Sequence, residues 1–116
     1  MGPETEWREA LARGELLLQR ARGSGRCFFP PRVAEPGSGD GDWEWVASTG
    51  KGAVYSATVV YPRPPAEPYN VVLVDLDEGV RVMSRVIGAD EVKIGMPVRA
   101  RIDREGDEPL LLFEPA

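Results

Sequence analysis

The sequence predicts a mainly β protein, because its second half consists of short apolar, β-branched segments separated by turn-forming residues. Ala53–Tyr61 and Tyr69–Leu76 are rich in valine and tyrosine, with a proline-rich loop between them. Three further segments follow, each after a glycine or a charged turn: Val80–Ile87, Val98–Ile102 and Leu110–Phe113. Segments of this length, spacing and composition are typical of a β-barrel or β-sandwich.

Five short strands, with a connection between the third and the fourth, predict a five-stranded OB-fold barrel. We expect a helical turn at Ala89–Val92 in that connection and a charged hairpin turn at Arg104–Glu108. An SH3-like barrel has a similar strand pattern, and periodicity alone does not separate the two. Gly50-Lys51-Gly52 is followed by a strand rather than a helix, so we interpret it as a turn and not as a phosphate-binding loop.

The N-terminal residues 4–13 predict a short helix. Thr5 is a suitable N-cap and Gly14 a suitable stop. Trp7 and Leu11 are four residues apart and therefore share one face of this helix. A helix of about ten residues is marginal by itself, so this face must dock either on the chain's own barrel or on a partner.

Two polar turns between the helix and the barrel have the outline of metal-binding knuckles, with candidate ligand positions three residues apart. Leu16–Leu18 and Cys27–Phe29 are the apolar segments beside them, and residues 33–42 form a glycine-rich loop. Structural zinc requires about four Cys or His ligands. The corresponding positions here are Ala21, Ser24, Glu35 and Ser38. The sequence therefore predicts a degenerate, metal-free, rubredoxin-like zinc-ribbon segment without a cofactor.

These segments give a predicted organisation in three parts: a helix over 1–14, the degenerate zinc-ribbon segment over 15–42 and the OB-fold domain over 43–116. The ribbon segment has little apolar content of its own. We therefore expect the barrel to fold without the first 41 residues.

The composition excludes several classes of function. The single cysteine, Cys27, cannot form an internal disulfide, and the absence of histidine excludes a Cys–His nucleophile. Pairs of carboxylates such as Asp75 and Asp77 lie beside predicted turns, where solvated carboxylates are commoner than catalytic ones. We expect no catalytic residue, and hence no enzyme activity of the chain itself.

Neither a membrane nor a nucleic acid is the expected partner. No segment approaches the roughly 18 apolar residues of a membrane span, and the N-terminus lacks a signal pattern, so we expect a cytoplasmic protein. The net charge is −5, with twelve arginines and two lysines. Binding to a single strand generally requires a basic groove, so a nucleic-acid-binding OB-fold protein is kept only as an alternative.

Several motifs occur in the order of one known family. They are Trp7, the segment 14–20, Phe29–Arg32 (FPPR), the segments 50–56 and 79–85, and Lys93–Val98. In these motifs the chain resembles the zinc-ribbon plus OB-fold family catalogued as domain of unknown function 35, except that all four family cysteines are lost.

The resemblance implies an accessory or scaffold subunit, because members of that family look like small partner proteins of thiolase-superfamily enzymes that act on acyl-CoA. The expected partner is a thiolase-like or aldolase-like enzyme, with a hydratase as a further candidate. A stand-alone acyl-CoA-binding module is a second alternative. The residues expected to bind the partner are Trp7, Leu11, Phe28, Phe29, Pro30, Pro31 and Arg32.

Overall fold

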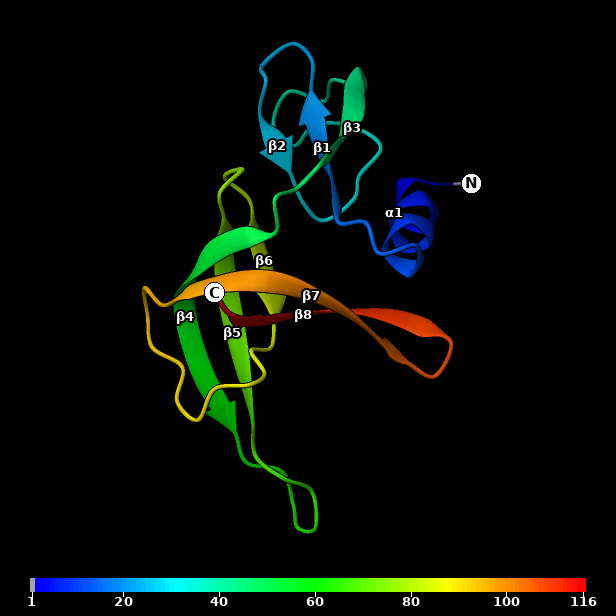
Figure 1. Cartoon of the computed structure of the whole chain (residues 1–116). Coiled ribbons are helices and arrows are strands. Elements are labelled where there is room, and N and C mark those ends of the chain that lie inside the picture. Colours follow the sequence, from blue (N-terminus) through cyan, green and yellow to red (C-terminus); the bar gives the residue numbers. More distant parts are fainter. Residues whose placement is uncertain (1) are drawn as a thin grey trace.

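A computed structural model describes residues 2–116, which form one short helix and two antiparallel β-sheets (Figure 1). The elements are α1 (Pro3–Ala12), β1 (Leu17–Ala21), β2 (Cys27–Phe28), β3 (Trp43–Ala47), β4 (Lys51–Val60), β5 (Tyr69–Leu76), β6 (Arg81–Ser84), β7 (Pro97–Glu105) and β8 (Glu108–Pro115). The sheets have the strand orders β2-β1-β3 and β6-β5-β4-β7-β8. No helix in the described residues is long and apolar enough to cross a membrane.

The larger sheet is a nearly closed barrel that contains all five predicted strands. A parallel bridge between Val86 and Phe113 brings the chain after β6 to β8, and so joins the two ends of the sheet. The mainly β class and the five-stranded barrel are therefore confirmed. Hairpin β7–β8 is longer than expected, because pairing continues to Glu105 and Glu108, and the turn is reduced to the two residues between them.

The helical turn expected at Ala89–Val92 does not form, and the prediction is wrong. The chain after β6 runs through bends to β4, where Gly95 N–H donates to the Val54 carbonyl (2.7 Å) and Val54 N–H donates to that of Met96 (3.0 Å). These bonds to a neighbouring strand favour an irregular, partly extended path over a helical one.

Strand β3 belongs to the smaller sheet. It pairs with β1 over its whole length, from Leu17 with Ala47 to Ala21 with Trp43. The expected boundary at residue 43 grouped this strand with the OB-fold domain, whereas its hydrogen-bonded partner lies in the smaller sheet. Alternation of aromatic and acidic residues indicates a strand, but it does not indicate which sheet the strand joins.

The helix begins at Pro3 and packs on its own chain. Gly2, rather than Thr5, is the N-cap, and the proline occupies the first turn, where its missing N–H costs nothing. The helix lies against β1 and β8. The Arg8 guanidinium is 3.3 Å from the Glu108 carboxylate, and the Arg104 side chain donates to the Ala12 carbonyl at 3.3 Å. The helix thus docks on its own chain, which is one of the two alternatives expected from the sequence.

A single apolar core runs through both sheets. Leu11, Leu16 and Leu18 from the N-terminal part are buried in the same cluster as the barrel residues, which include Val54 and Phe113. Folding of the barrel without the first 41 residues stays a prediction, and the shared core argues against it, because those residues supply part of the barrel's own core.

Gly52 shows why glycine leads into the first barrel strand. A Cβ atom at this position would collide with the carbonyl oxygen of Asp75 on β5. Glycine at position 52 is thus required by the close approach of β5, and Lys51 and Gly52 begin strand β4 rather than a phosphate-binding loop.

Leu18→Ala tests the shared core. We expect this substitution to lower the free energy of unfolding of the whole chain by about 2 to 5 kcal/mol, because it leaves a cavity at a fully buried position. Chemical unfolding followed by tryptophan fluorescence, which reports on the N-terminal part, and by circular dichroism, which reports on both sheets, should give one shifted transition. The half-buried neighbour Leu17→Ala is the control, with a smaller loss. Two separate transitions would contradict a shared core.

Candidate partner-binding surface

Two of the residues expected to bind a partner are buried within this chain. Leu11 is 2% exposed and Phe28 is 7% exposed. Leu11 belongs to the shared core, and Phe28 lies on β2 of the smaller sheet. Their apolar character is therefore explained by the chain's own packing, and we no longer count them in the candidate surface.

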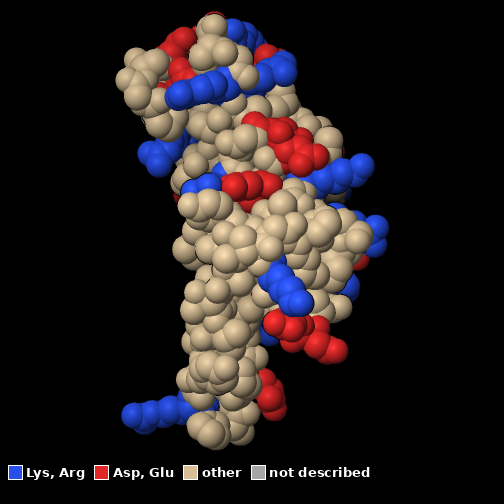
Figure 2. Space-filling view, turned by 90° about the vertical axis from the view of Figure 1, so that its left-hand side faces the viewer, with Lys and Arg blue, Asp and Glu red and all other residues tan. Residues whose placement is uncertain are grey.

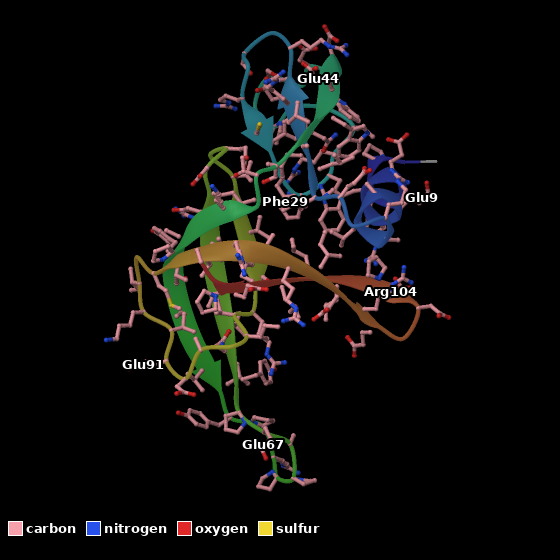
Figure 3. The ribbon with its side chains drawn as sticks, viewed as in Figure 1. Glu9, Phe29, Glu44, Glu67, Glu91 and Arg104 are labelled. Atoms are coloured by element: carbon pink, nitrogen blue, oxygen red, sulfur yellow. The ribbon has the colours of Figure 1, made fainter. Side chains whose placement is uncertain are left out.

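Phe29 lies between the smaller sheet and the barrel (Figure 3), and Trp7 of α1 packs against it. Their ring centroids are 5.5 Å apart with planes tilted by 59°, a favourable aromatic arrangement. The Trp7 indole N–H also donates to the carbonyl of Leu17 at 2.9 Å. Both residues are half-buried and pack against the shared core. They therefore lie beneath the candidate surface and contribute little exposed area to it.

The exposed part of the candidate surface is the loop after β2, where Pro30 and Arg32 are exposed and Pro31 is half-buried. A buried side chain, Gln19, holds this loop in place. Its amide donates to the Arg32 carbonyl and accepts from the Arg32 N–H at 2.8 Å. The backbone of Arg32 is thereby fixed, while the residue itself is exposed.

Val33 extends this surface, and the sequence analysis missed it. Its side chain is 76% exposed, while its carbonyl accepts a 2.9 Å hydrogen bond from the Trp43 indole. Trp43 packs edge-on against Trp45, whose indole N–H donates to Glu6 of the helix at 3.1 Å. We call the segment Pro30–Val33 the exposed loop. Trp43 and Trp45 lie on β3, about ten residues after the loop, so no local sequence pattern could reveal that they hold it.

The two polar turns have the same hydrogen-bond pattern. In the first, Gly25 N–H donates to the Ala21 carbonyl (2.8 Å) and Arg26 N–H donates to Ser24 Oγ (3.2 Å). In the second, Gly39 N–H donates to the Glu35 carbonyl (2.9 Å) and Asp40 N–H donates to Ser38 Oγ (3.2 Å). The two turns therefore share one pattern of backbone and serine hydrogen bonds.

The Glu35 carboxylate joins these turns. Ser24 Oγ and Ser38 Oγ each donate to it at 2.6 Å, and the Arg26 guanidinium lies 3.5 Å away. Glu35 is only 5% exposed, and a buried carboxylate is costly unless it is hydrogen-bonded. Three of the four candidate ligand positions thus meet through hydrogen bonds, and the fourth, Ala21, is fully buried beside them in β1.

These hydrogen bonds lower the pKa of Glu35 below its usual value of about 4.5. The bond from Ser24 has the largest effect, followed by that from Ser38, while partial desolvation opposes them and Arg26 adds a smaller lowering. Each contact that stabilises the ionised form makes protonation harder, so the carboxylate is ionised at neutral pH.

Two side chains considered as candidates for catalysis, Cys27 and Asp75, lie in environments that do not favour such a role. Burial raises the pKa of the Cys27 thiol above 9.0, although Arg20 lowers it in part, so the thiol is protonated at neutral pH. Asp75 accepts two hydrogen bonds from Arg81, which lower the pKa of its carboxyl. An ionised, paired carboxylate is poorly suited to act as a general acid.

The described residues contain no group of three or more Cys, Asp or Glu side chains placed to hold a metal ion. The arrangement at Ser24, Glu35 and Ser38 provides one carboxylate and two hydroxyl groups, which is not a donor set for structural zinc. The feature of the N-terminal part that remains as a candidate site is the exposed loop, which is held by hydrogen bonds from Gln19 and Trp43.

Comparison with known families identifies the protein's relatives. The profile described as the C-terminal OB-fold domain of ChsH2 matches residues 45–103, half of the chain. A DUF35 domain-containing scaffold protein of Methanocaldococcus jannaschii is 30% identical over 92% of this chain and 83% of its own length. The chain belongs to the DUF35 family.

Two further relatives of this DUF35 chain are informative. A probable enoyl-CoA hydratase alpha subunit of Thermomonospora curvata is 36% identical over 95% of the chain, which spans only 36% of that relative's length. The solved structure named Ltp2-ChsH2(DUF35) aldolase is 34% identical and superposes with a TM-score of 0.84, covering 97% of this chain and 94% of that one. The family and the OB fold expected from sequence are thus confirmed.

Glu35→Gln tests the link between the turns. A carboxyl whose pKa is lowered by folding stabilises the fold at pH values above its unfolded pKa, and this contribution is lost as the pH falls through the folded pKa. The wild type should therefore lose stability below about pH 4.5, and Glu35→Gln should be less stable at neutral pH with a flatter response to acid. Melting temperatures across this range measure both effects. Glu67→Gln, in the exposed loop after β4, is the control. Identical acid profiles for Glu35→Gln and the wild type would contradict the assignment.

Proposed function

We propose that this DUF35 chain is a non-catalytic accessory subunit that binds an aldolase-like or thiolase-like enzyme of acyl-CoA metabolism. One observation carries the proposal: a full-length structural match, at 34% identity, to the DUF35 chain of a structure named as an aldolase. Relatives of similar length are named DUF35 scaffold proteins, which supports a role without catalysis. A thiolase-like partner and a cytoplasmic location remain predictions from the sequence.

In this proposal the exposed loop Pro30–Val33 is a contact surface for the enzyme. It combines an arginine, a largely exposed valine and prolines, and arginine is enriched among residues that dominate interfaces. The bonds from Gln19 and Trp43 fix the loop before binding. A partner therefore does not have to supply the free energy of ordering it.

We further infer that the smaller sheet is a zinc ribbon whose ligand positions have been replaced. The equivalent turns at Ala21–Ser24 and Glu35–Ser38 support this inference, because each has the three-residue spacing and the backbone bonding of a metal knuckle. The Glu35 carboxylate, bonded to both serines, takes the place of the ion as the link between turns.

The replacement can be tested by reversing it. The natural chain should contain no stoichiometric zinc by elemental analysis, and a chelator should leave its melting temperature unchanged. The variant with Ala21→Cys, Ser24→Cys, Glu35→Cys and Ser38→Cys should bind one zinc ion and show the absorption of tetrahedral thiolate-bound cobalt when loaded with Co²⁺. A folded quadruple variant that binds neither ion would contradict the inference, as would zinc in the natural chain.

Arg32→Ala and Val33→Asp test the exposed loop. Each should weaken binding to a co-purified aldolase-like enzyme by about 1 to 2 kcal/mol or more, with little change in melting temperature, because neither side chain is part of the core. Met83→Asp, at an equally exposed apolar position on β6, is the control. By contrast, Trp7→Ala should lower stability as well, since Trp7 packs against the core. Unchanged affinity in both loop variants would exclude the loop from the interface.

A further inference from the structure

The second half of β4 has a neighbouring strand on one side only. Strand β4 pairs with β7 through Lys51–Ala53, and Val54 is bonded to the chain at Gly95 and Met96. From Ser56 to Val60, the strand pairs only with β5. Within the described residues, no other backbone or side-chain hydrogen bond reaches this stretch. Every second residue of Ser56–Val60 therefore directs its N–H and carbonyl groups to an open edge.

The opposite flank of this hairpin is closed. Asn70 on β5 donates to the Val86 carbonyl and accepts from the Val86 N–H, both at 2.8 Å. This side-chain amide holds the backbone of Val86 beside β5, next to the stretch Val72–Asp75 that pairs with β6. The β5 flank of the hairpin is thus covered by β6 and by the chain at Val86, whereas the β4 flank from Ser56 to Val60 faces no strand in the described part of the chain.

The open edge also lacks the usual protection against strand addition. Natural edge strands are commonly blocked by lysine, proline or an inward charge. Here the residues from Gly52 to Pro62 are all uncharged, and the β-bulge near Val54 lies before the open stretch. Figure 2, which faces this side of the molecule, shows the hairpin as a tan column with charged groups near its tip. A two-stranded hairpin is marginal alone, so a third strand would stabilise it.

A groove lies beside the open edge. Its volume is about 610 Å³, and it is bounded by residues 57–59, 68–70 and 85–92. The lining combines apolar side chains, including Ala57, Ile87 and Val92, with the charged side chains of Arg85, Asp90 and Glu91. Glu91 is labelled in Figure 3. Successive side chains of a β-strand point to opposite faces of the sheet. Every second side chain of an added strand can therefore enter this groove.

We propose that the edge Ser56–Val60 accepts an extended, uncharged segment of the partner enzyme, with apolar side chains at alternate positions, as an added β-strand. The proposal rests on the function proposed above and adds a second contact surface to it. Figure 1 shows that hairpin β4–β5 projects at the end of the molecule away from the smaller sheet and the exposed loop. An open strand edge selects an extended backbone, and the uncharged strand residues from Gly52 to Pro62 favour an uncharged segment beside them.

Hydrogen–deuterium exchange on the complex with the aldolase-like enzyme tests this proposal. In the free chain, alternate amides of Ser56–Val60 should exchange rapidly; in the complex, their exchange should slow by about tenfold or more. Val59→Glu should weaken the complex by about tenfold or more, because it places a charge in the added sheet, whereas Val59→Thr keeps a strand-forming residue and should bind normally. Met83→Glu, on the far edge strand β6, should also bind normally. Circular dichroism verifies that each variant is folded.

The outcomes separate this proposal from the proposed function. A complex that forms without slowing exchange at Ser56–Val60, or that Val59→Glu does not weaken, overturns the added strand and leaves the accessory-subunit role standing. Slow exchange already present in the free chain, together with a dimeric mass, assigns the edge to a second copy and also overturns the proposal. Failure of any complex to form contradicts the proposed function and the occupant named here.

Discussion

The hydrogen bonds that Glu35 accepts from Ser24 and Ser38 hold the N-terminal part of the protein in its shape. They join two turns that are 11 residues apart in sequence, counted from Ser24 to Glu35. Bonds to an ionised acceptor are shorter and stronger than bonds between neutral groups, so one carboxylate can replace part of what a metal ion would provide. The loop that carries Arg32 and Val33 lies between these turns, and its path depends on them.

The smaller sheet and the barrel are connected by more than a linker. Leu16, just before β1, and Leu18, within β1, pack into the barrel core. Gln19 on the same strand fixes the exposed loop. Folding of the barrel therefore also orders the exposed loop that we propose as a contact surface. This coupling suits an accessory subunit, because its binding surface loses little conformational entropy when the complex forms.

Much of the barrel could be predicted from sequence, because alternating β-branched residues and proline- or glycine-containing turns are local signals. Other features depend on contacts between distant residues. Phe28 was expected to be an exposed anchor, yet it is buried. The sequence could not show this, because aromatic residues occur both in cores and in interfaces. Strand β3 joined the smaller sheet because its partner is β1, which its own pattern does not specify.

The candidate site shows the same limit. The positions of Ser24, Glu35 and Ser38 were predictable from their spacing, but their mutual hydrogen bonds were not. Gln19 follows three leucines, and nothing in that pattern indicates a buried amide that binds the backbone 13 residues later.

The central claim is that this DUF35 chain acts as a subunit of an enzyme complex. The most direct test is the molar mass, by size-exclusion chromatography with light scattering, of the chain mixed with an aldolase-like or thiolase-like enzyme encoded beside it. A single stoichiometric species containing both proteins is the result that the account predicts. Separate elution of the two proteins at micromolar concentration would contradict it.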